Sequence, residues 1–258
     1  MKYYTIFSED ERHYGMKYVT GLNTDIKPFN PSGDCISGGI YFSREDILAF
    51  LSHGLWLRDV TLPDGEPVYE NPDSPRKWKA HRVILGKRRK ITTKVIRELI
   101  AAGADVHAND DAALRWAAGR GHEEIVKLLI AAGADVHADD DAALRRAAGR
   151  GHEEIVKLLI AAGADVHADD DVALRRAADK GHEEVVKTLL AAGADVHAND
   201  DAALRWAASN GYEDVVKILI AAGADVHAND DAALRLAAGI GHEEIAKLLI
   251  AAGANRTS

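Results

Sequence analysis

Histidine and aspartate, two side chains that often hold metal ions, recur in this sequence at a fixed spacing. The histidines stand thirty residues apart, at His107, His137, His167, His197 and His227, and each is followed by an aspartate pair, the first beginning at Asp110. Stacked helices lie roughly 8–10 Å apart, whereas metal ligands must come within about 2 Å of the ion. We therefore expect hydrogen bonds within each loop and no metal site.

Other candidates for chemistry lie in the first ninety residues. Cys35, His53 and His81 show no metal-ligand spacing, and no nucleophile–base pair can be assigned to them. They are interpreted as ordinary structural residues, and no cofactor is expected.

One motif offers an alternative. The segment "GGIYFS" at residues 38–43 resembles the tyrosine-bearing motif of ADP-ribosyltransferases. That resemblance implies Tyr41 as a ring platform for nicotinamide, His13 as a ribose contact, and Glu66 or Glu70 as the acid. A glycine turn before an aromatic strand is also common in an ordinary core, so our prediction is a protein that is not an enzyme.

A longer pattern surrounds the spaced histidines. The segment "AAGADVHA" begins at Ala101, Ala131, Ala161, Ala191 and Ala221, and "AAGA" returns at Ala251. Each copy is typical of two short helices and a loop, with Asp111 placed to cap the first helix and Gly133 placed in a left-handed turn after the second. Helices this short do not persist alone, so stacking must hold them.

The segment "GHEEIVKLLIAAGADVHA" resembles the ankyrin repeat, over about residues 91–254. The copies depart from the family in their period, which is 30 residues instead of about 33. They also carry Ala112-Ala113-Leu114-Arg115 where the family has Thr-Pro-Leu-His. In this style they resemble the short-repeat ankyrin proteins of giant DNA viruses of amoebae. The resemblance implies a mostly α fold, a solenoid of helix pairs that binds proteins.

The expected organisation has two parts. Residues 1–90 contain strand-like segments and one helix near 43–54, with Ser43 and Asp46 approximating a capping box, and predict a small α+β domain that caps the array. Residues 91–258 predict the ankyrin-repeat array: a half repeat at 91–103, five 30-residue repeats at 104–253 and a short C-terminal tail.

The copies differ at few positions. Two variable positions, four residues apart and therefore on one helical face, hold Trp116, Arg120, Arg146, Arg150, Arg176, Lys180, Trp206, Asn210, Leu236 and Ile240. In ankyrin proteins these positions face the concave groove, where partners usually bind. Trp and Arg are enriched at interface hot spots, so we predict a groove for an acidic, partly apolar protein segment. The alternatives are drift at solvated positions, with Trp covering the neighbouring helix, and a phosphate-backbone partner.

Charge and composition limit the partners. The net charge is −9, and residues 91–258 carry 18 basic and 29 acidic side chains, a balance of −11. A nucleic-acid partner for the whole surface is therefore not expected.

The location follows from the same data. One cysteine cannot form an intramolecular disulfide, and neither a membrane span nor a signal peptide is evident. We expect a soluble protein in the cytoplasm of a host cell. The basic stretch from Arg76 to Lys90 is either a nuclear-import signal or a solvated strand whose apolar residues Trp78, Ala80, Val83 and Leu85 face inward.

The sequence thus favours a non-catalytic protein-interaction module. Two rivals remain open: an ADP-ribosyltransferase-like N-terminal domain whose substrate the repeats select, and a structural protein that self-associates through an uncapped C-terminal repeat.

Overall fold

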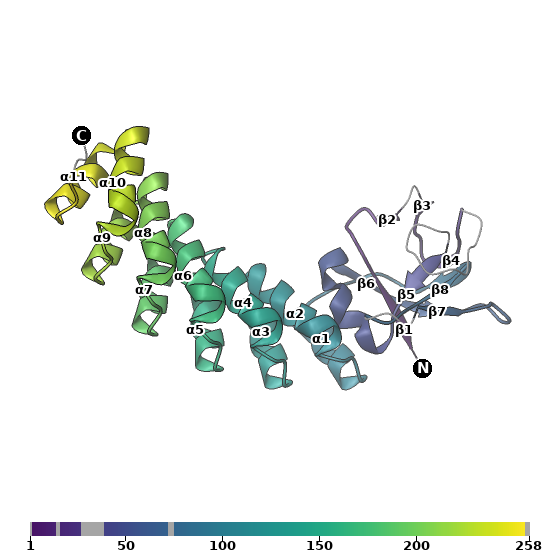
Figure 1. Cartoon of the computed structure of the whole chain (residues 1–258). Coiled ribbons are helices and arrows are strands. Elements are labelled where there is room, and N and C mark those ends of the chain that lie inside the picture. Colours follow the sequence, from purple (N-terminus) through teal and green to yellow (C-terminus); the bar gives the residue numbers. More distant parts are fainter. Residues whose placement is uncertain (1, 14–15, 27–38, 72–74, 256–258) are drawn as a thin grey trace. The chain divides into compact units, whose positions relative to one another are not determined.

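The structure is a computed structural model that describes residues 2–13, 16–26, 39–71 and 75–255. The chain consists of two compact units, Met1–Trp116 with Lys127–Asp135 and Ala117–Val126 with Val136–Ser258. Strands fill the first part of the sequence and helices the rest (Figure 1). Within the described ranges, every helix is too short or too polar to cross a bilayer. Cys35 lies outside the described residues.

The N-terminal part of the first unit is built from short antiparallel strands. Among the described residues, one sheet has the order β1-β6-β9-β4 with β10 also paired to β6, a second has the order β5-β8-β7, and β2 pairs with β3. The strands are β1 (Tyr3–Phe7), β2 (Arg12–His13), β3 (Met16–Lys17), β4 (Gly21–Thr24), β5 (Ile40–Phe42), β6 (Trp56–Thr61), β7 (Tyr69–Asn71), β8 (Lys77–Ala80), β9 (Arg82–Leu85) and β10 (Arg89–Lys90).

Apolar side chains of these strands build the domain core. Trp78 and Ala80 on β8 and Val83 and Leu85 on β9 are buried against Phe42. The prediction that the apolar residues of the basic stretch face inward is therefore confirmed.

The predicted helix is present as a 3-10 helix, η1 (Glu45–His53), but the predicted capping box is wrong. The Ser43 hydroxyl donates to the carbonyl of Arg76 at 2.8 Å, and the Asp46 carboxylate accepts from the Arg76 amide. Both side chains are engaged by the segment that leads into β8, so neither serves the helix end.

A buried ion pair links the strands. Arg58 on β6 donates from Nε and Nη2 to the two carboxylate oxygens of Glu11, at 2.7 and 2.8 Å. Its Nη1 donates to the carbonyl of Gly86 at 2.6 Å and to the hydroxyl of Thr20 at 2.9 Å. The Arg58 guanidinium holds the pKa of Glu11 below its ordinary value. Because both charges are buried and fully bonded, this pair fixes the loop before β2 against the sheet.

Helix α1 (Thr93–Ala101) follows, and the described residues from 108 to 251 then form five helix pairs. The pairs are α2 (Ala108–Gly119) with α3 (Glu123–Ala131), α4 (Ala138–Ala148) with α5 (Glu153–Ala161), α6 (Ala168–Asp179) with α7 (Glu183–Ala191), α8 (Ala198–Asn210) with α9 (Glu213–Ala221), and α10 (Ala228–Ile240) with α11 (Glu243–Ala251). Their alanine and leucine faces are buried, as stacking of thin helices requires.

The first helix of each pair begins with a left-handed turn. In α6, Asp169, Asp170 and Asp171 have φ angles of 56°, 53° and 54°, and the same turn recurs in the other four copies. Asn and Asp adopt this conformation more readily than other non-glycine residues because their short side chains bond the local backbone. The "NDD" and "DDD" segments therefore encode a reversal of the backbone before each helix.

Helix η1 contacts the start of the array within the first unit. The amide of Asp105 donates to the carbonyl of Glu45 on η1 at 2.7 Å. In the next copy the equivalent amide, that of Asp135, donates to the carboxylate of Asp111 at 2.9 Å. The Glu45 carbonyl of η1 thus accepts the hydrogen bond from Asp105. In the next copy, the carboxylate of Asp111 accepts the equivalent bond from Asp135.

Candidate protein-binding site on the repeat helices

The first helices of successive copies form one row within the second unit. Helices α4, α6, α8 and α10 pack side by side, and α5, α7, α9 and α11 form the second row (Figure 1). On each first helix, alanine and leucine side chains are buried, and the two variable positions lie on the opposite face. We call this surface of the second unit the variable face: Arg120, Arg146, Arg150, Arg176, Lys180, Trp206, Asn210, Leu236 and Ile240.

The centre of the variable face is basic and exposed. Arg146 on α4 and Arg176 on α6 are exposed, as are Arg150 and Lys180 just after these two helices. Within the described part of the chain, Arg150 and Arg176 make no ion pair. Their guanidinium groups are therefore available to a carboxylate or phosphate of a partner.

Two of these arginines pack against a glycine of the preceding copy. A Cβ atom on Gly119 would lie 3.3 Å from the Cβ of Arg146, and a Cβ atom on Gly149 would lie 3.4 Å from the Cβ of Arg176. The arginine stems therefore cover the end of the preceding helix, while their charged ends extend to solvent.

The third copy differs, because Asp179 stands where the earlier copies have glycine. Its carboxylate pairs with Lys180 at 3.0 Å and accepts from the Asn210 side-chain amide at 2.9 Å. Lys180 and Asn210 are thus both bound to Asp179, and the carboxylate of Asp179 lowers the positive charge at this end of the variable face.

The two tryptophans are not equivalent. Trp116 is 8% exposed, so most of its ring is covered, as the alternative of a tryptophan packed on its neighbours predicts. Trp206 is half-buried, and the guanidinium of Arg175 lies over its ring at 5.7 Å. Trp206 therefore presents ring surface to solvent, whereas Trp116 offers little.

The two ends of the variable face have different character. Leu236 and Ile240 on α10 are 39% and 59% exposed and form an apolar end. Arg120 is exposed at the other end, beside His122. Burial lowers the pKa of His122, and the charges of Arg120 and His152 lower it further.

The repeated histidines bond within their own loops, as predicted. Nδ1 of His167 lies 3.2 Å from the carboxylate of Asp171, and His227 makes the same contact with Asp231 at 3.0 Å. Among the described residues, no cluster of metal-binding side chains occurs.

The structural role of the repeated aspartate was missed. Asp171 is buried, and its carboxylate accepts from the Asp195 amide of the next copy at 2.8 Å. An N-cap residue needs extended backbone angles, whereas Asp171 is left-handed, so it links copies instead of capping its own helix. The buried members of this set are Asp111, Asp141, Asp171, Asp201 and Asp231.

The repeated arginines serve the left-handed turn. Nη2 of Arg145 donates to the carbonyl of Asp139 at 2.6 Å, and Nη2 of Arg175 donates to that of Asp169 at 2.8 Å. Arg145 also pairs with Asp169 of the following copy at 2.9 Å. These arginines therefore bond the backbone carbonyls of their own turn, and Arg145 bonds a carboxylate of the next copy as well.

Of the ADP-ribosyltransferase candidates, Tyr41 and Glu70 lie on β5 and β7, the outer strands of one three-stranded sheet. Tyr41 lines a cavity in the N-terminal domain. Glu66 is bound to Arg82, with its Oε2 2.7 Å from the arginine Nε, and Glu70 is exposed on β7. The backbone of His13 lies in β2. A glutamate already held by an arginine is a poor match for a catalytic acid.

The basic stretch is folded into the domain. The guanidinium of Arg88 lies 4.3 Å from the Trp56 ring centre, and Arg89 pairs with Asp59 and Glu98 at 2.9 and 3.0 Å. Lys87, Arg88 and Lys90 are exposed, so a nuclear-import signal in this stretch stays a prediction.

Comparison with known proteins identifies the array. The sequence profile of ankyrin repeats in three copies matches residues 88–170 and 174–258. The chain belongs to the ankyrin repeat family. This confirms both the recognition and the predicted fold class, a mostly helical repeat array with a strand-rich N-terminal region. Ankyrin repeats imply a protein–protein interaction module.

Several similar proteins come from Acanthamoeba polyphaga mimivirus. Ankyrin repeat protein R229 is 43% identical over 125 residues, covering 45% of this chain and 40% of that protein. Ankyrin repeat protein R868 is 34% identical over 130 residues, covering 48% and 64%. Uncharacterized protein R869 is 34% identical over 129 residues, covering 48% of this chain and 94% of that protein. The matches to R229 and R868 span less than two thirds of those proteins.

Proposed function

We propose that the variable face binds a protein segment that is acidic in its middle and apolar at one end. The observation that carries the proposal is the row of exposed Arg146, Arg150 and Arg176 on neighbouring copies of an otherwise acidic array. Arg150 and Arg176 make no ion pair within the described chain, and Leu236 and Ile240 continue the face with exposed apolar side chains.

Energetics favour arginine and tryptophan as the anchors. Guanidinium groups bind carboxylates through two parallel hydrogen bonds and lose little hydration when they do so. Trp206, half-buried and held by Arg175, supplies rigid aromatic area at low entropic cost. Trp116 is too covered to contribute equally, so the proposal places binding from Arg120 onward.

Residues 1–90 take the role of a cap in this proposal. The bond from Asp105 to Glu45 and the ion pair between Arg89 and Glu98 support it. The cap holds α1 in place and leaves the partner to the repeats.

The test is a matched pair of charge reversals. Arg150→Glu/Arg176→Glu changes the variable face, and Lys157→Glu/Lys187→Glu makes the same charge change on α5 and α7, where both lysines are exposed. Native protein and both variants are used as bait in Acanthamoeba lysate, after circular dichroism shows equal helix content. Capture of one partner by the native and control proteins, with loss only in the first variant, supports the proposal. Equal capture by all three contradicts it.

Self-association is the rival that a specific observation favours. Leu236, Ile240 and Ile250 are exposed on α10 and α11, and exposed apolar patches mark sites of protein–protein contact. Sedimentation velocity over a hundredfold range of concentration decides between the two. A mass that rises with concentration and returns to that of the monomer in Leu236→Lys/Ile240→Lys would favour self-assembly.

A further inference from the structure

A cavity of about 310 Å³ opens in the N-terminal domain, lined by residues of β1, β5 and η1 together with Arg12, Tyr18 and Lys77. Six of its fourteen lining residues are aromatic: Tyr4, Phe7, Tyr18, Tyr41, Phe42 and Phe50. The whole chain has only seven Tyr and four Phe. More than half of these residues therefore gather at one cavity.

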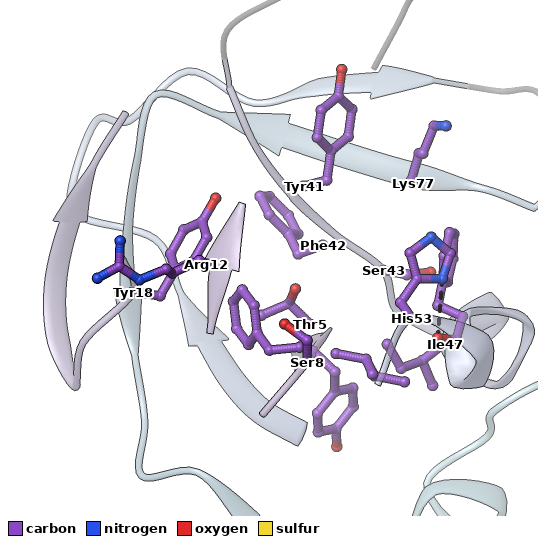
Figure 2. Close-up of a pocket in the computed structure, with 14 residues that line it drawn as sticks. Thr5, Ser8, Arg12, Tyr18, Tyr41, Phe42, Ser43, Ile47, His53 and Lys77 are labelled. Atoms are coloured by element: carbon purple, nitrogen blue, oxygen red, sulfur yellow. Dashed lines mark hydrogen bonds between the residues drawn. The ribbon is translucent and has the colours of Figure 1, made fainter. Parts of the chain in front are cut away.

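Figure 2 shows how the lining is arranged. Arg12 and Tyr18 lie on one side, Ser43, Ile47 and His53 lie on the other, and Thr5, Ser8 and Phe42 lie between them. Phe7, Phe42 and Ile47 are buried, whereas Arg12 and His53 are exposed and Lys77 is half-buried. The cavity thus has an apolar interior and basic side chains at its edge.

The lining carries positive and no negative charge. Its ionisable groups besides tyrosine are Arg12, His53 and Lys77, and among these described lining residues there is neither aspartate nor glutamate. Lys77 Nζ lies 5.6 Å and Lys79 Nζ 5.7 Å from the centre of the Tyr41 ring.

The neighbouring carboxylate of Asp10 reduces the positive charge next to Arg12, whereas the phenol of Tyr18 adds no charge. Burial raises the pKa of Tyr18 to about 12, so its phenol is neutral at physiological pH. The nearby carboxylate of Asp10 accepts hydrogen bonds from the Ser8 hydroxyl at 2.6 Å and from the Arg12 amide at 3.2 Å.

We propose that this cavity binds a small molecule that combines an aromatic ring with a phosphate or carboxylate group. The ring packs against Phe7 and Phe42, and the anion lies at the edge of the cavity, where Arg12 on one side and Lys77 on the other attract it. A cavity of about 150 Å³ is enough to hold benzene, so this one has room for two fused rings. Ligand sites are typically apolar pockets with a few polar groups that fix orientation, which is the composition seen here.

The test uses 1-naphthyl phosphate, 1-naphthol and inorganic phosphate as probes of the full-length protein. Binding is measured by NMR titration, with the methyl groups of Ile6 and Ile47 as reporters inside the cavity. We expect 1-naphthyl phosphate to shift both methyl signals and to bind at least tenfold more tightly than 1-naphthol. Inorganic phosphate alone should bind too weakly to saturate.

Arg12→Gln/Lys77→Gln should raise the Kd for 1-naphthyl phosphate at least tenfold and leave that for 1-naphthol unchanged, which also shows that the cavity is still formed. Lys87→Gln/Lys90→Gln, which removes two exposed charges elsewhere in the domain, should change neither value. Equal binding of 1-naphthol and 1-naphthyl phosphate, or unshifted Ile6 and Ile47 signals at saturation, would overturn the proposal. This cavity shares no residue with the variable face, so either proposal can fail while the other stands.

Discussion

Two neighbouring aspartates in the same left-handed turn have different roles in this protein. Asp170 and Asp171 share left-handed backbone angles, but Asp170 is exposed and Asp171 is buried. Only Asp171 bonds the amide of the following copy and His167. The sequence predicted Asp111 and its equivalents as helix caps, and repetition alone does not show that they are buried and bond the next copy.

This difference gives a matched prediction. Asp170→Ala should lower the free energy of unfolding by about 1 kcal/mol, since alanine is less tolerant of the left-handed region. Asp171→Ala should cost about 2–4 kcal/mol, because it also leaves a buried amide without its acceptor. Urea unfolding followed by circular dichroism measures both. Equal losses would show that the carboxylate does not link the copies.

Glu11 and Arg58 make a prediction about pH. The pKa of Glu11 is lowered in the folded protein, chiefly by its hydrogen bond to Arg58, so the pair stabilises the domain above the unfolded pKa, near 4.5. That contribution is lost as pH falls through the lower, folded pKa. At pH 7, Glu11→Gln should cost about 3 kcal/mol because it leaves Arg58 buried without a counter-charge.

The measurement is hydrogen exchange of the β6 amides in native protein and Glu11→Gln. The difference in opening free energy between the two proteins should shrink as pH is lowered from 7 to 3. A difference that stays constant over this range would mean that the pair contributes no pH-dependent stability.

At the scale of elements, glycines set how closely the repeats approach. Gly151 and Gly163 both have positive φ, 74° and 100°. A Cβ atom on Gly151 would lie 2.7 Å from the His182 ring, whereas one on Gly163 would have nothing within 4 Å. Gly151 therefore packs against the histidine of the next copy, in addition to its place at the end of a helix.

Two alanine substitutions separate these effects. Gly163→Ala should cost about 1 kcal/mol, from backbone strain alone. Gly151→Ala should cost about 1–3 kcal/mol more, because the His182 ring must move in a packed site. Thermal unfolding of both variants gives the comparison, and equal melting temperatures would argue against the ring contact.

Element types were largely predictable, and the exceptions have physical causes. Helix pairs follow from apolar spacing and glycine, and strands such as β1 and β6 follow from alternating β-branched and aromatic residues. The capping box at Ser43 and Asp46 failed because both side chains found partners thirty or more residues away, near Arg76. The burial of Trp116 was likewise set by tertiary packing, which local sequence does not record.

At the scale of the whole molecule, a strand-rich domain and a repeat array share one chain. Within the first unit, Arg89 joins them, because it pairs with Asp59 on β6 and with Glu98 on α1. These pairs are partly exposed, so their combined contribution is about 1 kcal/mol.

Arg89→Ala should therefore make the α1 amides exchange about fivefold faster, whereas Lys90→Ala, an exposed neighbour, should not. Hydrogen exchange at the Ile96 amide, in the buried face of α1, reports the effect. Faster exchange in Lys90→Ala, or none in Arg89→Ala, would contradict a role for Arg89 in holding the cap.

The central claim is that partners bind at the variable face of the array. Its most direct test places a photo-crosslinking amino acid at Lys180 or Asn210 on that face, or at Lys157 or Lys187 on α5 and α7. After irradiation in Acanthamoeba lysate, adducts are identified by mass spectrometry. The account predicts one protein joined to positions 180 and 210 and absent from 157 and 187. Adducts at 157 and 187 alone would place the interaction on the other row of helices.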